Sequence, residues 1–252
     1  MWDRVKFKQA GKAAFKKNYW PCVGVCILLA IAMGQFNVNY DFDEIVRFES
    51  ITGLIFGLLG IFGSITGIAL GIAVFNPYEV GARRFTMENR ITEKARFSIV
   101  GYGFSKNYGN VVLVQFMRNL FTFLWFLLLI VPGIIKALAY FAVPFILAEN
   151  PNMPYKRALQ LSKDMTMGHK GELFDMFMSF IGWALLSALT GGIVGAFHYF
   201  PYLYATEAEA YAFLREEALM KGIASIDELP GFGEPEFFWN SEPAEGAPAD
   251  EE

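Results

Sequence analysis

The residue in this sequence whose position most suggests specialised chemistry is Arg118. It stands in VQFMRNLF, inside an apolar segment that carries no other charge. If that segment crosses a bilayer, the guanidinium must face a partner or a water-filled cavity, because an isolated charge there is costly. Asp175, in ELFDMF, is the expected partner, and Glu79, Glu149 and Glu207 are alternatives. Such a pair either holds helices together or lies beside a solute pathway, although Arg118 can also snorkel to the cytoplasmic surface.

The histidine and cysteine residues give no sign of a metal site or a catalytic site. His169 and His198 are far apart, and the sequence has no H-E-x-x-H or paired C-x-x-C spacing. Cys22 and Cys26 share one helical face and suit small apolar positions. No nucleophile–base pair and no paired carboxylates stand out. We therefore expect no enzymatic activity, no metal and no cofactor.

The composition is that of a membrane protein. Of the 252 residues, 54% are hydrophobic and only 18% are charged. Soluble domains are about 45–50% apolar and about 25% charged, and the excess here lies in long runs that suit a bilayer. The formal net charge of −4 arises from residues 227–252, which hold nine acidic residues and no basic one. The rest of the chain is only mildly basic, which excludes a nucleic-acid binder.

Six apolar segments suit transmembrane helices. They are 20–36, 51–75, about 111–131, 134–149, 173–190 and 192–206. Residues 1–19 carry six Lys or Arg, whereas the 37–50 loop carries only Arg47. Because basic residues near spans stay in the cytoplasm, we expect a multi-pass protein of the cell membrane with both termini cytoplasmic. Two alternatives are open: Lys136 allows the fourth segment to be re-entrant, and a signal peptide could be cleaved after Ala32.

Prolines interrupt three of the apolar segments, each time just before an aromatic ring. They are Pro77, Pro144 and Pro201. We expect each proline to kink its helix at the cytoplasmic side, with the following ring at headgroup depth. The alternative is that the three kinks form a gate or a lipid-facing groove. A short polar segment precedes a span in three places, and its expected interfacial residues are Asn18, Asn107 and His169.

These features recur in one order, which predicts three parallel repeats over about 1–90, 91–151 and 152–221. Each repeat comprises an interfacial amphipathic helix and a Pro-kinked transmembrane hairpin. The repeats would surround an axis along the membrane normal. The predicted fold class is therefore an all-α membrane protein with six transmembrane helices in a membrane domain of residues 1–221.

Glycines at intervals of four residues mark the second predicted span. They are Gly53 and Gly57, followed by Gly63, Gly67 and Gly71. Small residues at this spacing let helix backbones approach closely, within one chain or in a homo-oligomer. A glycine-lined pore is the alternative.

Three stretches of the chain resemble a known family. They are FSKNYGNVVLVQFMRNLFTFLWFLLLIVPGIIKALAYFAVPFILAENPNM at 104–153, GHKGELFDMFMSFIGW at 168–183 and NPYEVGARRF at 76–85. Together they are similar to bacterial multi-pass membrane proteins called domain of unknown function 975. The resemblance covers roughly residues 5–215. It implies an integral membrane protein without an agreed activity, and it supplies no catalytic residues.

The sequence favours one function and leaves a second open. The leading expectation is a non-enzymatic accessory or scaffold protein that packs with lipids, with membrane protein partners or with a second copy of itself. The alternative is a transporter or channel whose pathway follows the pseudo-threefold axis near Arg118. Residues 222–252, rich in Pro, Gly and acid, predict a disordered cytoplasmic tail, in which EFFW at 236–239 could dock a partner.

Overall fold

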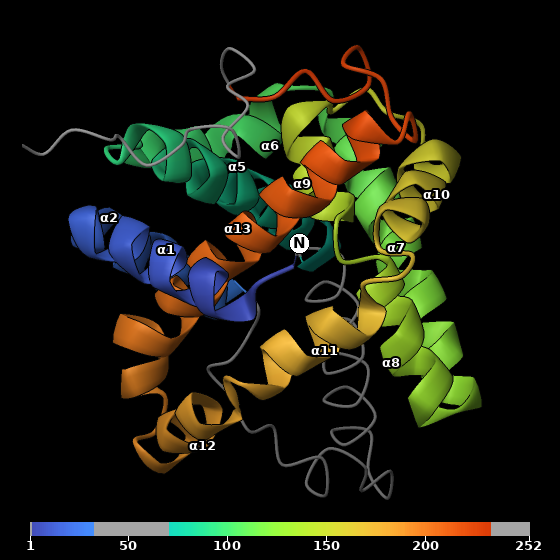
Figure 1. Cartoon of the computed structure of the whole chain (residues 1–252). Helices are drawn as coiled ribbons and strands as arrows, with labels where there is room; N and C mark the ends of the chain where they lie inside the picture. Colours follow the sequence, from blue (N-terminus) through green and yellow to red (C-terminus); the bar gives the residue numbers. More distant parts are fainter. Residues whose placement is uncertain (1, 33–70, 233–252) are drawn as a thin grey trace, which may run out of the picture.

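The computed structural model describes residues 2–32 and 71–232, and this part of the chain is helical without strands (Figure 1). Its elements are α1 (Arg4–Lys17), α2 (Tyr19–Ala32), η1 (Gly71–Phe75), α5 (Asn76–Thr92), η2 (Phe97–Gly101), α6 (Tyr102–Ser105), α7 (Tyr108–Leu128), α8 (Ile130–Ala139), α9 (Val143–Glu149), α10 (Tyr155–Met165), α11 (Lys170–Met178), α12 (Ile181–Leu189), η3 (Gly195–Tyr199) and α13 (Phe200–Met220). The prediction of an all-α chain is confirmed for these residues.

Three helical segments are long and apolar enough to cross a membrane. They are Tyr108–Leu128, Ile130–Glu149 and Lys170–Leu189. The count of six spans stays a prediction. Most of the second predicted span lies outside the described residues, together with Gly53, Gly57, Gly63 and Gly67, whereas Gly71 begins η1.

Large apolar side chains are exposed where the hairpins end. Leu127, near the end of α7, is 73% exposed, and Leu189, at the end of α12, is 85% exposed. The α8 and α12 ends project from the same side of the molecule (Figure 1). A large exposed apolar surface marks a protein or membrane contact. With the three span-length segments, it indicates that the protein associates with a membrane.

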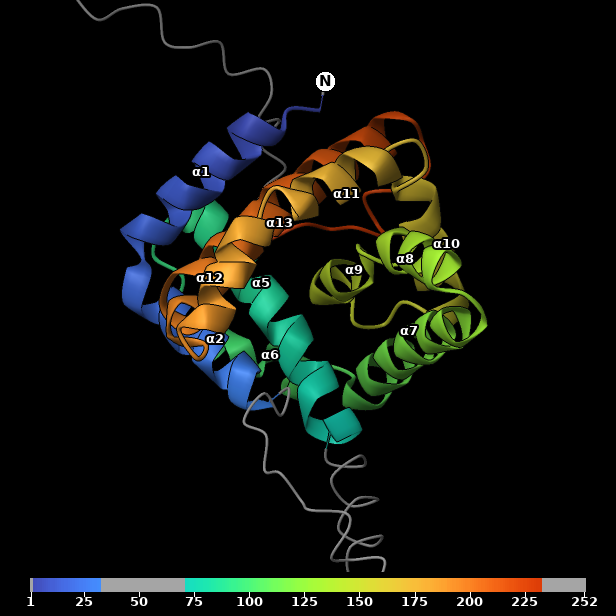
Figure 2. The same ribbon diagram turned by 90° about the horizontal axis from the view of Figure 1, so that it is seen from below.

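The packed core surrounds α9. All seven residues of this helix are buried, and Figure 2 shows it inside a ring of the other helices. The helix contacts α5, α7 and α10. The ring of Phe145, on α9, stacks on Tyr211 of α13 with centroids 4.7 Å apart. Side chains therefore fill the middle of the helix ring.

Each of the three prolines lies in the first turn of a helix. Pro77 begins α5, Pro144 begins α9 and Pro201 begins α13. A proline at this position loses no helical hydrogen bond, because the first N–H groups of a helix are unpaired anyway. The π-helical turns η1 and η3 precede α5 and α13, and a turn at 140–142 precedes α9. The prolines thus mark a change of helix geometry instead of a bend within one regular α-helix.

Two of the helices that begin at a proline pack closely against another helix. A Cβ atom on Gly11 of α1 would lie 2.7 Å from the backbone N of Thr206 in α13. A Cβ atom on Gly103 of α6 would lie 2.1 Å from the carbonyl O of Pro77 in α5. Only glycine allows backbones to approach this closely. The α1–α13 and α6–α5 contacts are therefore backbone-to-backbone packing.

The amphipathic helix α10 packs in a comparable way beside the third proline. The hydroxyl of Ser162 donates to the carbonyl O of Ala139 at 2.8 Å and accepts from the backbone N of Ala142 at 3.1 Å. Both partners lie just before α9. A small polar side chain on α10 thus satisfies the backbone groups that are left free where the helix is interrupted.

The chain after α13 is folded back onto the molecule. Leu229 is fully buried, and its carbonyl O accepts from Nη2 of Arg215 at 2.6 Å. The guanidinium of Arg157, on α10, donates to both carboxylate oxygens of Glu228, at 2.6 and 2.7 Å. The predicted disorder is therefore wrong for residues 222–232, because a buried leucine and charged hydrogen bonds anchor them. Residues 233–252 lie outside the described range.

Candidate functional site

An ion network joins α5, α7 and α13 beside α9. The two Nη atoms of Arg118 donate to the Glu79 carboxylate, each at 3.1 Å. Arg83, one turn after Glu79 on α5, pairs with Glu207 of α13 and lies 4.0 Å from Glu79. Cations and anions therefore alternate in the order Arg118, Glu79, Arg83, Glu207, and their formal charges cancel.

The position of Arg83 follows from the local sequence. Glu79 lies in the first turn of α5, where the helix dipole favours an anion. Arg83 is four residues later, so the two side chains share one helical face. The guanidinium carbon of Arg83 lies 5.1 Å from the ring centroid of Phe145 and 4.5 Å from that of Tyr204. Ion pairs and aromatic faces together hold this cation in place.

The two carboxylates of the network respond differently to burial. Burial alone would raise the pKa of Glu79, but the charges of Arg118 and Arg83 hold that pKa below its ordinary value. At Glu207 burial outweighs the charge of Arg83, and the pKa is raised. On acidification Glu207 is therefore the first carboxylate of the network to take up a proton.

Three buried polar atoms beside the network have no hydrogen-bond partner within the described part of the chain. They are Nδ2 of Asn76, Oε1 of Gln115 and Nε of Arg83. Gln115 is fully buried, and its Nε2 donates to Glu79 at 2.9 Å. An unpaired buried polar atom is costly. The Arg118 side chain keeps 18% exposure, so one end of the network reaches the surface.

The predicted pairing of Arg118 with Asp175 is wrong. Asp175 pairs instead with Arg4 of α1, whose Nη1 lies 2.7 Å from its carboxylate oxygen. Glu79, one of the alternatives, is the partner of Arg118. Sequence reasoning missed Arg83, although its spacing of four residues from Glu79 was an available signal.

The three predicted interfacial residues, Asn18, Asn107 and His169, make comparable long-range contacts. Each links the start of a hairpin to a segment at the end of a helix that begins at a proline. Nδ2 of Asn18 donates to Oδ1 of Asn89 in α5 at 2.6 Å. Nδ2 of Asn107 donates to Oδ1 of Asn152, after α9, at 2.9 Å. Nε2 of His169 lies 2.6 Å from Oε2 of Glu217 in α13. We call these three contacts the hairpin ties.

A second buried cluster surrounds Glu149, one of the alternative partners of Arg118. Its carboxylate accepts from Nε of Arg215 at 2.9 Å and from the hydroxyl of Tyr211 at 2.6 Å. The backbone N of Gly231 also donates to it, at 2.8 Å. These bonds leave Glu149 fully engaged within the chain, so this cluster fixes the end of α9 and the segment after α13.

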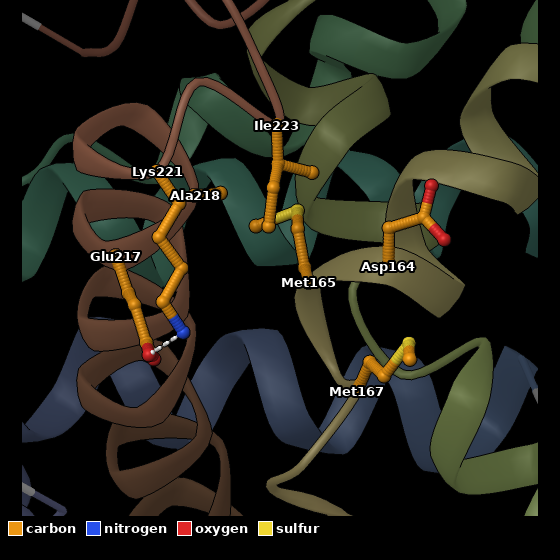
Figure 3. A pocket seen from close by; sticks show the side chains of 7 residues that line it. All are labelled: Asp164, Met165, Met167, Glu217, Ala218, Lys221 and Ile223. Carbon is orange, nitrogen blue, oxygen red and sulfur yellow. Dashed lines mark hydrogen bonds and ion pairs between the residues drawn. The ribbon is translucent and has the colours of Figure 1, made fainter.

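A pocket of about 440 Å³ lies between α10 and α13. Figure 3 shows Met165, Met167 and Asp164 on one side and Glu217 and Lys221 on the other. Lys221 forms an ion pair with Glu217, so these two charges satisfy each other. The lining therefore combines flexible apolar side chains with few charged groups that lack a partner. Among residues 2–32 and 71–232, no group of three or more His, Cys, Asp or Glu could hold a metal ion.

The comparison with protein families gives one match. The model of the family described as protein of unknown function (DUF975) matches residues 97–218. This range runs from η2 through almost all of α13, so it contains Arg118 and Glu207 but not Glu79 or Arg83. No curated protein and no solved structure matches the chain.

Proposed function

We propose that this chain, whose residues 97–218 match the model of the family described as protein of unknown function (DUF975), is a non-enzymatic scaffold or accessory protein of the cell membrane. It crosses the membrane six times, in three parallel units, with both termini in the cytoplasm. Its role is to pack with lipids or with membrane protein partners. No step of covalent chemistry is part of this proposal.

The cyclic packing of the helices supports the three-unit architecture. The amphipathic stretches η2 and α6 pack on α5, the preceding unit, and α10 packs on α7 and α9 of its own preceding unit. Helix α1, the first in the chain, packs on α13, the last. Each unit therefore covers the unit before it, and the first covers the third. Such an arrangement closes a ring, as expected of repeats that cannot bury their apolar faces alone.

The hairpin ties support the same division of the chain. Asn18 and Asn89 belong to the first proposed unit, and His169 and Glu217 belong to the third. The Asn107–Asn152 tie lies at the junction of the second unit with the third. Contacts between the start of a hairpin and the end of a helix that begins at a proline, or the segment just after it, thus recur along the chain, although different groups form them. Recurrence of a contact is stronger support for a repeat than similarity of composition.

The filled centre of the ring is the observation that carries the scaffold proposal. Helix α9 is buried along its whole length, and Arg83 beside it is paired with two carboxylates. Buried charges that neutralise one another fix the relative positions of helices. A pathway for a charged solute would need some of these charged side chains to be unpaired, so that they could contact the solute.

A transporter or channel is the second candidate function, and one observation favours it. Gln115 and Asn76 each bury an unpartnered polar atom next to Arg118, which is partly exposed. A polar solute or a file of water molecules would satisfy such atoms. The pathway would then pass between α5 and α7, on one side of α9.

Membrane topology is tested by cysteine labelling in intact cells. The background is Cys22→Ala, Cys26→Ala, because both native cysteines are free and buried. We expect Leu129→Cys and Thr190→Cys, at the hairpin ends, to react with an impermeant maleimide from outside. Lys6→Cys, on α1, should react only after the membrane is opened. Protection of both hairpin positions from outside, with labelling from inside, would contradict six crossings.

The scaffold and pathway proposals are separated at Gln115. In the same background, Gln115→Cys should stay unlabelled from either side, because the side chain is fully buried. Ser105→Cys, an exposed position at the end of α6, serves as the reactive control. Labelling of Gln115→Cys in folded protein would indicate an aqueous path and favour the transporter.

A further inference from the structure

A row of four cations runs along one side of α1. Arg4, Lys8, Lys12 and Lys16 are each four residues apart, so they lie on one helical face. Like charges at this spacing repel one another and destabilise a helix. The row is therefore stable only where anions or other acceptors offset it.

The first two cations of the row are offset within the chain. Arg4 pairs with Asp175 of α11 at 2.7 Å. Nζ of Lys8 donates to the hydroxyl of Ser179 at 3.2 Å and lies 4.4 Å from the ring centroid of Phe180. This half of α1 is thus held against the third hairpin by its own charges.

The last two cations of the row have no such partner. Lys12 and Lys16 are exposed, and neither forms an ion pair with any residue that the structure describes. Phe15, next to Lys16 in the chain, packs against His198 of η3, with ring centroids 5.8 Å apart. The ring of His198 lies against Trp183 of α12, with centroids 4.6 Å apart. Two cations without an ion-pair partner among the described residues therefore lie next to the third hairpin.

The surroundings of Lys12 and Lys16 are those of a membrane interface. Trp20, shortly after them in the chain, is 72% exposed, and the hydroxyl of Tyr19 donates to the carbonyl O of Phe197 at 3.0 Å. Aromatic side chains of this kind gather at headgroup depth. Helix α2 contacts η3, which in turn contacts α12, and the exposed side chains of α12 are apolar.

We propose that Lys12 and Lys16 bind the phosphate of an anionic phospholipid, whose acyl chains lie along α12 and η3. The inference rests on the proposed membrane location and adds a specific lipid site to it. Charge complementarity selects an anionic headgroup, because two ammonium groups with no ion pair in the described part of the chain lie four residues apart on one face. Exposed Ile181, Leu185 and Leu186 of α12 provide the apolar surface that a lipid needs and a soluble anion does not.

The site is tested by quenching of Trp183 fluorescence with brominated lipids. The full chain carries Phe in place of its other four tryptophans and is reconstituted into phosphatidylcholine vesicles. Brominated phosphatidylglycerol or brominated phosphatidylcholine is then added at equal mole fraction. We expect brominated phosphatidylglycerol to quench Trp183 more strongly than brominated phosphatidylcholine does. In Lys12→Gln, Lys16→Gln this preference should fall by roughly fivefold to thirtyfold, since each lysine near an anionic surface contributes a factor of about five.

Two further variants make the result specific. Lys12→Arg, Lys16→Arg keeps the charges and should keep the preference. Lys156→Gln, Lys163→Gln removes two exposed lysines of α10, the same change in charge at a different place, and should also keep it. Equal loss in this control would assign the effect to overall charge and overturn the site. An unchanged preference in Lys12→Gln, Lys16→Gln would overturn it as well.

Two remaining outcomes test the membrane location and the choice of a lipid as ligand. If neither brominated lipid quenches Trp183 in the parent protein, the membrane location of this hairpin fails, and the proposed function fails with it. Glycerol phosphate in solution has the headgroup chemistry without acyl chains, and it should leave the preference unchanged. Its displacement of the lipid would show a site for soluble phosphate esters and overturn the lipid assignment.

Discussion

The first two hairpin ties are made by pairs of amides, whereas the third is made by an imidazole and carboxylates. Asn18 meets Asn89 and Asn107 meets Asn152, and both contacts are amide-to-amide hydrogen bonds. In the third tie, His169 lies between Glu217 and Glu172, with a carboxylate oxygen at each ring nitrogen. Comparable positions in the chain thus use chemically different groups.

The difference shows that the position of a tie matters more than the groups that form it. Any donor–acceptor pair of suitable reach can join the start of a hairpin to the end of a helix. The third tie also contacts the N-terminus, since Trp2 stacks on His169 with centroids 5.6 Å apart. The third tie is therefore the one that joins three elements and responds to pH.

Replacement of Asn89 should have the largest effect on stability. The side chain is buried, accepts from Asn18 and donates to the carbonyl O of Ala14 at 3.1 Å. Asn89→Leu removes the hydrogen bonds to Asn18 and to the carbonyl O of Ala14, and it leaves both groups without this partner in a buried place. We expect a loss on the order of 2 kcal/mol, measured by denaturant unfolding in detergent micelles. A free energy of unfolding equal to that of the parent would show that the first tie does not stabilise the fold.

Replacement of His169 should have an intermediate effect that depends on the new side chain. His169→Ala removes contacts with Glu217 and the stacking on Trp2, and we expect a loss of about 1 kcal/mol. His169→Asn gives the third tie an amide, as in the other two ties, and should recover part of the stability that His169→Ala loses. The same unfolding experiment measures both. If Asn is no better than Ala, the ties are not interchangeable.

The third tie should weaken in acid. Burial would raise the pKa of Glu217, but its hydrogen bond from Lys221 and the charge of His169 hold that pKa below its ordinary value. A depressed carboxyl pKa stabilises the fold above the unfolded-state value, and this contribution is lost as the pH falls through the folded-state pKa. The denaturant concentration at the unfolding midpoint should therefore decrease once the pH is below about 4. In Glu217→Gln the acid-side drop should be smaller, and an identical profile would exclude this carboxylate as its source.

Replacement of Asn152 should have the smallest effect. This side chain is exposed, as is Asn107, and water can replace the hydrogen bond between them. We expect Asn152→Ala to change stability by no more than about 0.5 kcal/mol. The comparison with Asn89→Leu then separates burial from the chemistry of the tie, because both changes remove one member of an amide pair. A large loss here would show that the second tie is the main anchor.

The sequence indicates the helices and the positions that connect them. The apolar runs locate α7, α8, α11 and α12, because helix length and hydropathy are local properties. The prolines and the polar segments before the spans point to the helix starts and to Asn18, Asn107 and His169. These features depend on the identity of neighbouring residues, so they can be deduced without knowing the fold.

The pairing of charges could not be deduced in the same way. Arg118 bonds to Glu79, which lies in a helix beyond the predicted span and 39 residues earlier. The order of the helices around the ring decides this choice, and hydropathy carries no information about it. Leu229 was missed because one apolar residue among acidic and small residues predicts a disordered segment, whereas Arg157 and Arg215 supply anchors from distant helices.

Closure of the ring is the central structural claim, and cross-linking of α1 to α11 tests it most directly. Arg4→Cys and Asp175→Cys replace an ion pair between the first amphipathic helix and the third hairpin. With a short bis-thiol reagent in native membranes, peptide mass spectrometry should find these two positions joined within one chain. Arg4→Cys with Leu129→Cys, at the end of another hairpin, should give no such product. Absence of the α1–α11 cross-link, or its formation only between isotope-distinguished copies, would contradict a ring closed within the monomer.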